Sequence, residues 1–162
     1  MTLQRLSKPA AIVVLANALM LLSSCGNNGC EETRESYFSA TLTATGRISL
    51  TKLYAWALTA DGDSLMTSAS SPTSLELMLR PDTTQTRIRL QCTIDDSGDE
   101  YQYDDTLTIG YQPYPYFLDM ECGCSMFYDI TEVSVTDHLF KGITINNSEI
   151  TNEETVNITL TY

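Results

Sequence analysis

The stretch Thr86–Ile94, TRIRLQCTI, decides the fold. Apolar and polar residues alternate along it, with Ile88, Leu90 and Cys92 at one set of positions and Arg87, Arg89 and Gln91 at the other. Successive side chains of a strand point to opposite faces of the sheet. The pattern therefore predicts a β-strand with one buried face and one solvated face.

The residues that follow predict a hairpin. Asp95–Asp99 (DDSGD) is rich in turn-forming residues, and the alternation resumes at Tyr101 and Tyr103. A second turn signal, Asp61-Gly62, separates two other β-prone segments. Short connections of this kind favour antiparallel neighbours.

The same alternation recurs along most of the chain, and no window predicts an amphipathic helix. The other expected strands include Phe38–Ala44, Ile48–Leu58, Leu75–Leu79, Leu107–Tyr111 and Val156–Leu160. Pro113 and Pro115 are expected to end the strand that precedes them. We therefore predict an all-β, antiparallel, immunoglobulin-like β-sandwich of about eight to ten short strands, formed by a single domain over residues 36–162.

The N-terminus carries an export signal. Arg5 and Lys8 precede the apolar run Ala10–Leu22, which is shorter than the about 20 residues of a membrane span. Ser23 and Ser24 then lead directly into Cys25. The stretch Leu22–Cys25 resembles the lipobox of bacterial lipoproteins.

That resemblance implies the location of the protein. Residues 1–24 would be removed as a signal peptide, Cys25 would be lipidated, and residues 25–35 would form a short tether. Gly26 after the cysteine favours the outer membrane in diderm bacteria. The membrane is thus one expected partner, through the N-terminal lipid, with the domain facing either the periplasm or the cell surface.

Four cysteines remain once Cys25 is assigned to the lipid. An even number in an exported domain predicts disulfides. Cys122 and Cys124 stand about 6.6 Å apart on one face of an extended segment, so direct pairing would be strained. We expect either Cys30–Cys122 with Cys92–Cys124, or Cys30–Cys124 with Cys92–Cys122.

Charge excludes one class of partner. The formal net charge is −12, so nucleic acid is not an expected ligand. The acidic turn of Asp95, Asp96, Asp99 and Glu100 lacks the spacing of a calcium-binding EF-hand loop. No metal or other cofactor is expected.

The best candidate for a binding surface is aromatic. Tyr111, Tyr114, Tyr116 and Phe117 cluster with two prolines, which keep a segment out of central sheet positions. Exposed aromatic rings on a β-sandwich could stack on a sugar ring or contact an envelope protein. A carbohydrate-binding or adhesin-type module is therefore an alternative function.

A hydrolase is a further alternative, with weaker support. His138 follows Asp137, but neighbours on a strand point to opposite faces, so Asp137 is not placed to orient the imidazole. The chain also contains no G-x-S-x-G nucleophile motif. We expect a protein without enzymatic activity.

Several short motifs resemble a family of small lipoproteins of unknown function from diderm bacteria. They are Asp105–Tyr111, Glu121–Gly123, Tyr128–Ile130, Val135–His138 and Val156–Leu160. The resemblance implies an exported, β-sandwich-like domain with no established activity. The leading hypothesis is a membrane-anchored envelope lipoprotein whose domain binds or scaffolds an unidentified ligand.

Overall fold

The computed structural model describes residue 30 and residues 33–162. The chain divides into two compact units, Met1–Glu31 and Glu32–Tyr162, and all the described strands belong to the second. The described residues contain no helix. Their ten strands are β1 (Tyr37–Thr43), β2 (Ser49–Thr59), β3 (Gly62–Ser70), β4 (Ser74–Met78), β5 (Gln85–Asp96), β6 (Asp99–Asp119), β7 (Gly123–Val135), β8 (Gly142–Ile145), β9 (Glu149–Ile150) and β10 (Ile158–Thr161).

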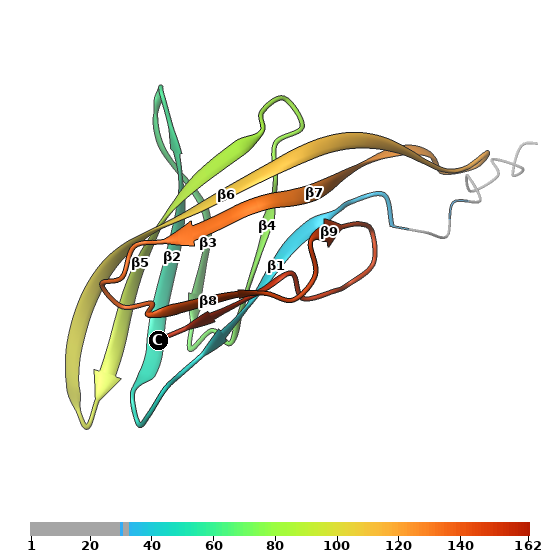
Figure 1. Cartoon of the computed structure of the whole chain (residues 1–162). Coiled ribbons are helices and arrows are strands. Elements are labelled where there is room, and N and C mark those ends of the chain that lie inside the picture. Colours follow the sequence, from blue (N-terminus) through green and yellow to red (C-terminus); the bar gives the residue numbers. More distant parts are fainter. Residues whose placement is uncertain (1–29, 31–32) are drawn as a thin grey trace, which may run out of the picture. The chain divides into compact units, whose positions relative to one another are not determined.

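The strands form two sheets that pack together as a β-sandwich (Figure 1). One sheet has the order β4-β1-β10-β8 and the other has the order β3-β2-β5-β6-β7-β9. All pairs are antiparallel except β1 with β10, in which Ala40 faces Ile158 and Leu42 faces Leu160. The predicted all-β sandwich is confirmed, with four and six strands in its sheets rather than the four and three of an immunoglobulin constant domain.

Both predicted hairpins are present. In the β5–β6 hairpin, Asp96 pairs with Asp99 across a turn in which Ser97 and Gly98 have positive φ angles of 59° and 101°. In the β2–β3 hairpin, Thr59 pairs with Gly62, whose φ of 124° is accessible to glycine and strained for other residues. The turn residues therefore fix the register of the larger sheet.

The core lies between the inward faces of the two sheets. Fully buried side chains come from both of them, and Phe140 is added from the loop between β7 and β8. The buried strand residues include Phe38, Ile88, Leu90, Leu107, Ile109, Ile158 and Leu160. Ile88 of β5 pairs with Leu107 of β6, so the apolar residues of Thr86–Ile94 lie beside those of the next strand of the hairpin. Burying each such side chain contributes about 1.5–3 kcal/mol, so this layer supplies most of the driving force for folding.

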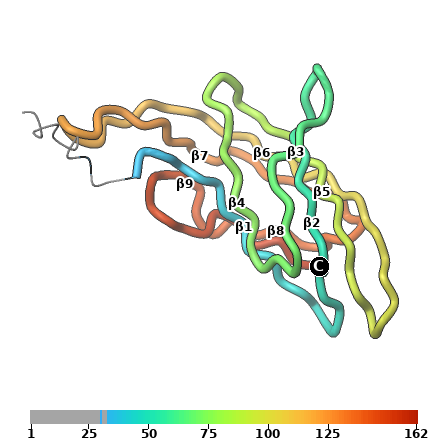
Figure 2. The backbone as a smooth tube through the Cα atoms, turned by 180° about the vertical axis from the view of Figure 1, so that it is seen from behind, coloured from blue at the N-terminus to red at the C-terminus, as the bar shows by residue number. Residues whose placement is uncertain are grey.

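Strand β6 is longer than predicted, because it continues through Pro113 and Pro115 to Asp119. The expectation that these prolines end the strand is wrong. Pairing with β5 stops at Gly110, which faces Gln85, and beyond that point β6 pairs with β7 alone. Proline is tolerated there because the missing N–H would have had no strand partner on the open side. Figure 2 shows β6 and β7 continuing together as an outer ribbon.

Candidate functional site

The predicted aromatic surface divides into a buried part and an exposed part. Tyr111 is only 1% exposed, so its inclusion in a binding surface is wrong. Its hydroxyl lies 2.8 Å from Oγ1 of Thr86 and donates to the carbonyl oxygen of Arg80 at 3.1 Å. Its ring packs edge-on against Tyr128 at 5.5 Å. Tyr111 is therefore a core residue that ties the end of β4 to the larger sheet.

The other three aromatic residues of the segment remain accessible. Tyr116 and Phe117 are 49% and 55% exposed, and Tyr114 is half-buried. Tyr116 stacks on Phe127 with a centroid separation of 4.8 Å and an interplanar angle of 12°. Tyr114, the cross-strand partner of Phe127, meets the same ring edge-on at 6.1 Å. Phe127 is 4% exposed, so it forms the floor under two accessible tyrosines.

These rings form one wall of a groove of about 480 Å³. The opposite wall is polar and comes from the chain around and after β9. The lining residues are Tyr114, Tyr116, Leu118 and Phe127 on the aromatic side, and Asn147, Glu149, Thr151, Asn152 and Glu153 on the polar side. We call this cavity the aromatic–acidic groove. Its volume lies in the range of small-molecule sites, about 300–1,000 Å³.

A buried asparagine holds the polar wall in place. Asn157 is 0% exposed, and its Nδ2 donates to the carbonyl oxygens of Glu149 at 2.9 Å and Asn147 at 3.3 Å. Its Oδ1 accepts a hydrogen bond from the backbone N–H of Ser39 at 2.9 Å. The β9 residue Glu149 also pairs with Asp129 of β7. The groove is thus preorganised by backbone and side-chain contacts before any ligand arrives.

The electrostatic field in the groove is negative. Burial raises the pKa of Tyr114, and the nearby carboxylates of Asp129 and Glu149 raise it further. Among the described residues, no ion pair involves Glu149 or Glu153. A ligand in this groove therefore meets two carboxylates that are not paired with any cation of residues 33–162.

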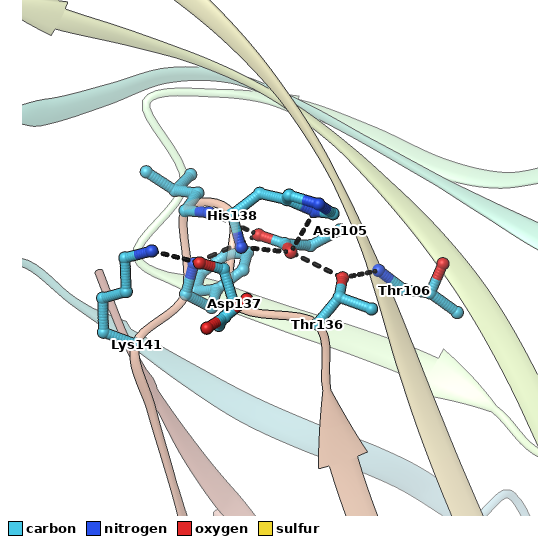
Figure 3. Close-up of polar contacts among 8 residues, drawn as sticks. Asp105, Thr106, Thr136, Asp137, His138 and Lys141 are labelled. Carbon is cyan, nitrogen blue, oxygen red and sulfur yellow. Dashed lines mark hydrogen bonds and ion pairs between the residues drawn. The ribbon is translucent and has the colours of Figure 1, made fainter.

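A second polar cluster surrounds Asp105 (Figure 3). The carboxylate, whose side chain is 0% exposed, accepts hydrogen bonds from Oγ1 of Thr136 at 2.6 Å and from the backbone N–H groups of His138, Leu139 and Phe140 at 3.0, 2.8 and 3.1 Å. Burial raises the pKa of Asp105, but the four hydrogen bonds outweigh it, so the pKa lies below its ordinary value. Asp105 therefore anchors the loop between β7 and β8 as an ionised group.

The same aspartate also orients His138. Its Oδ1 lies 3.1 Å from Nδ1 of the imidazole, whose side chain is 63% exposed, whereas Asp137 provides only a backbone carbonyl oxygen, to Nζ of Lys141. The sequence reasoning missed Asp105. Its signal was the alternation with Leu107 and Ile109, which places it on the inward face. Ester or peptide hydrolysis would also need a nucleophile beside the imidazole, and the loop-anchoring bonds account for the cluster without one.

The cysteines separate into two kinds. Cys30 and Cys122 each take part in a disulfide bond, as expected, whereas Cys92 and Cys124 are free thiols. The expectation that all four pair is therefore wrong. Cys92 faces Tyr103 and Cys124 faces Phe117, positions separated by roughly 45 Å along β6, and a disulfide needs Cα atoms within about 7 Å.

The two free thiols differ in environment. Cys92 lies in the core between the sheets, where burial, with smaller effects of Asp105 and Asp104, raises its pKa to about 12. It is thus a protonated, inert side chain at neutral pH. Cys124 is exposed near the end of the β6–β7 ribbon. Cys25, the predicted lipidation site, lies outside the described residues.

The acidic turn behaves as a hairpin tip. Oδ1 of Asp95 accepts from the N–H of Gly98 at 3.2 Å, and Oδ1 of Asp96 accepts from the hydroxyl of Ser97 at 3.2 Å.

Within residues 33–162 and at residue 30, no three His, Cys, Asp or Glu side chains are grouped to hold a metal ion. The same part of the chain has no helix long and apolar enough to span a membrane.

Comparison with known proteins gives a family but no activity. The model of a family of unknown function (DUF6452) matches residues 52–162. No curated protein and no solved structure matches the chain. The matched residues include β3 to β10 and therefore both walls of the aromatic–acidic groove and the Asp105 cluster. Because this match covers more than half of the sequence, the chain belongs to the family of unknown function DUF6452.

Proposed function

We propose that this protein is a lipid-anchored, non-enzymatic binding protein of the bacterial outer envelope. The observation that carries the proposal is the aromatic–acidic groove. Its accessible rings lie beside carboxylates that form no ion pair among the described residues, and a ligand site commonly combines aromatic side chains with a few polar groups.

The anchor rests on the sequence around Cys25. Its resemblance to a lipobox supports removal of residues 1–24 and acylation of the cysteine. More than one acyl chain gives stable membrane attachment, since each buried methylene contributes about 0.8 kcal/mol. Metabolic labelling with palmitate tests this step. We expect label in the wild-type protein and none in Cys25→Ala, and an unlabelled wild-type protein would refute the anchor.

The binding role is tested with the detergent-solubilised full-length protein on a glycan array. Tyr116→Ala removes the exposed ring of the groove and should abolish the bound set. Tyr101→Ala is the matched control, because Tyr101 is 48% exposed and lies near the β5–β6 turn, outside the groove lining. If both variants retain the wild-type profile, the groove is not the binding site.

A further inference from the structure

We infer that the aromatic–acidic groove binds a glycan whose sugar rings carry protonated amino groups. The inference rests on the proposed binding function and adds the chemical class of the ligand. It combines two properties of the groove, its charge and the geometry of its rings.

The negative charge of the groove favours a positively charged ligand. Glu149 and Glu153 line the groove without an ion pair, and Asp129 stands beside it as the β-sheet partner of Glu149. The described lining contains no Lys, Arg or His. Ligands that carry carboxylate, sulfate or phosphate groups would meet like charge in the groove, whereas an ammonium group would compensate both glutamates.

A neighbouring cavity extends this field. It has a volume of about 400 Å³ and shares Thr151, Asn152 and Glu153 with the groove. Its lining adds three further glutamates, Glu35, Glu76 and Glu154, together with Tyr37. The segment Thr151–Glu153 therefore has carboxylates on both sides, which suits a ligand with repeated positive charges rather than a single one.

The exposed ring of Tyr116 on the aromatic wall favours a ligand that contains sugar rings. Tyr116 already uses one face against Phe127, and its 49% exposure leaves ring surface open to the groove. A pyranose presents a flat C–H face that packs on such a ring, as other apolar surfaces do. On the opposite wall, the amide of Asn147 is occupied by Thr155 and by the N–H of Glu149. The hydroxyl of Thr151 accepts from the N–H of Glu153 and can still donate its own hydrogen to a sugar hydroxyl.

The alternative of a basic peptide is less favourable. An extended peptide gains affinity by pairing its backbone with a free strand edge. The open edge of β6 beyond Gly110 contains Pro113 and Pro115, which have no N–H to donate. On the other wall, β9 is only two residues long. Neither wall offers a ladder for a peptide backbone.

Isothermal titration of the full-length protein in detergent tests the inference. The ligands are the β-1,4-linked tetramers of glucosamine and of N-acetylglucosamine and the α-1,4-linked tetramer of galacturonic acid, which carry positive, neutral and negative charge, with tetralysine as the peptide arm. We expect the glucosamine tetramer to bind about tenfold more tightly than the acetylated tetramer, and the galacturonate tetramer not to bind. Equal affinity for the first two, or tighter binding of tetralysine, would overturn the inference.

Two variants connect the result to the groove. Glu149→Gln should remove most of the preference for glucosamine over its acetylated form, and Glu100→Gln, at an exposed position in the β5–β6 hairpin, should not. Tyr116→Ala should weaken both glycans by about tenfold. Suppose that the glucosamine and N-acetylglucosamine tetramers do not bind, but that Tyr116→Ala still loses the ligands found on the glycan array. The inference about the ligand class then fails, and the proposed binding function stands. If Tyr116→Ala changes no ligand, both fail.

Discussion

The inner half of β6, which ends at Tyr111, and its outer half, Gln112–Asp119, are both rich in large apolar side chains but differ in burial. In the inner half, Leu107, Ile109 and Tyr111 are almost completely buried. In the outer half, Tyr116 and Phe117 are about half exposed. The difference arises from the neighbours of the strand, since β5 pairs with the inner half only and β7 is the only partner of the outer half. A segment of large apolar side chains becomes core where it is covered, and its rings stay accessible where it is not.

The largest loss of stability is expected for a substitution in the inner half of β6. Ile109→Ala removes a fully buried side chain between the sheets and should destabilise the protein by about 2–5 kcal/mol, because it leaves a cavity in the core. Urea unfolding followed by circular dichroism measures the change. A loss below about 1 kcal/mol would mean that the inner half is not packed as described.

The next effect concerns the buried carboxylate at the beginning of the inner half. Asp105→Ala leaves the N–H groups of Leu139 and Phe140 without an acceptor and should cost about 2–4 kcal/mol. The His138→Ala variant provides the matched comparison, because it removes the exposed ring and retains the backbone bonds. It should cost much less.

Asp105 also gives the inner half a pH signature. Its folded pKa lies below the unfolded value of about 3.9, so its contribution is fully present above about pH 4 and is lost as the pH falls through the folded pKa. The stability advantage of the wild-type protein over Asp105→Asn should therefore shrink as the pH falls below the unfolded pKa of about 3.9. An advantage that is constant over this range would contradict an ionised anchor.

A smaller effect is expected at the polar wall that faces the outer half. Asn157→Ala leaves Ser39 N–H and the carbonyl oxygens of Asn147 and Glu149 without their side-chain partner and should cost about 1–3 kcal/mol. Glycan affinity should fall as well, because the wall loses its fixed position. Glu154→Ala, at an exposed position of the same loop, should leave the free energy of unfolding nearly unchanged.

The smallest stability effect is expected in the outer half itself. Tyr116 is about half exposed and packs on a single ring, so Tyr116→Ala should change the free energy of unfolding by about 0.5 kcal/mol or less. Thermal unfolding beside Ile109→Ala measures the contrast. A loss as large as that of the core variant would assign Tyr116 to the structural core.

Most of the fold could be predicted from local pattern. Alternation in Thr86–Ile94 and the turns at Asp61-Gly62 and Asp95–Asp99 specify strands and hairpins, because both signals depend on neighbours in sequence. The continuation of β6 through Pro113 could not be predicted in this way. It depends on where β5 ends, which is a property of the sheet and not of the segment.

The candidate site was less accessible to sequence reasoning. The aromatic residues were visible, but the burial of Tyr111 depends on distant partners, Thr86 and Arg80. The polar wall around Glu149 is placed by Asn157, whose contacts no local spacing reveals. The free thiols of Cys92 and Cys124 likewise reflect separation along the sheet, which a cysteine count does not contain.

Ligand-induced thermal stabilisation tests the division of β6 most directly. A ligand that binds only the folded state raises the melting temperature by mass action. At a concentration of the glucosamine tetramer near its dissociation constant for the wild-type protein, we expect the melting temperature of the wild-type protein and of Tyr101→Ala to rise equally, and that of Tyr116→Ala to rise much less. An equal rise in Tyr116→Ala would show that the outer half of β6 does not bind the ligand, and would contradict the account.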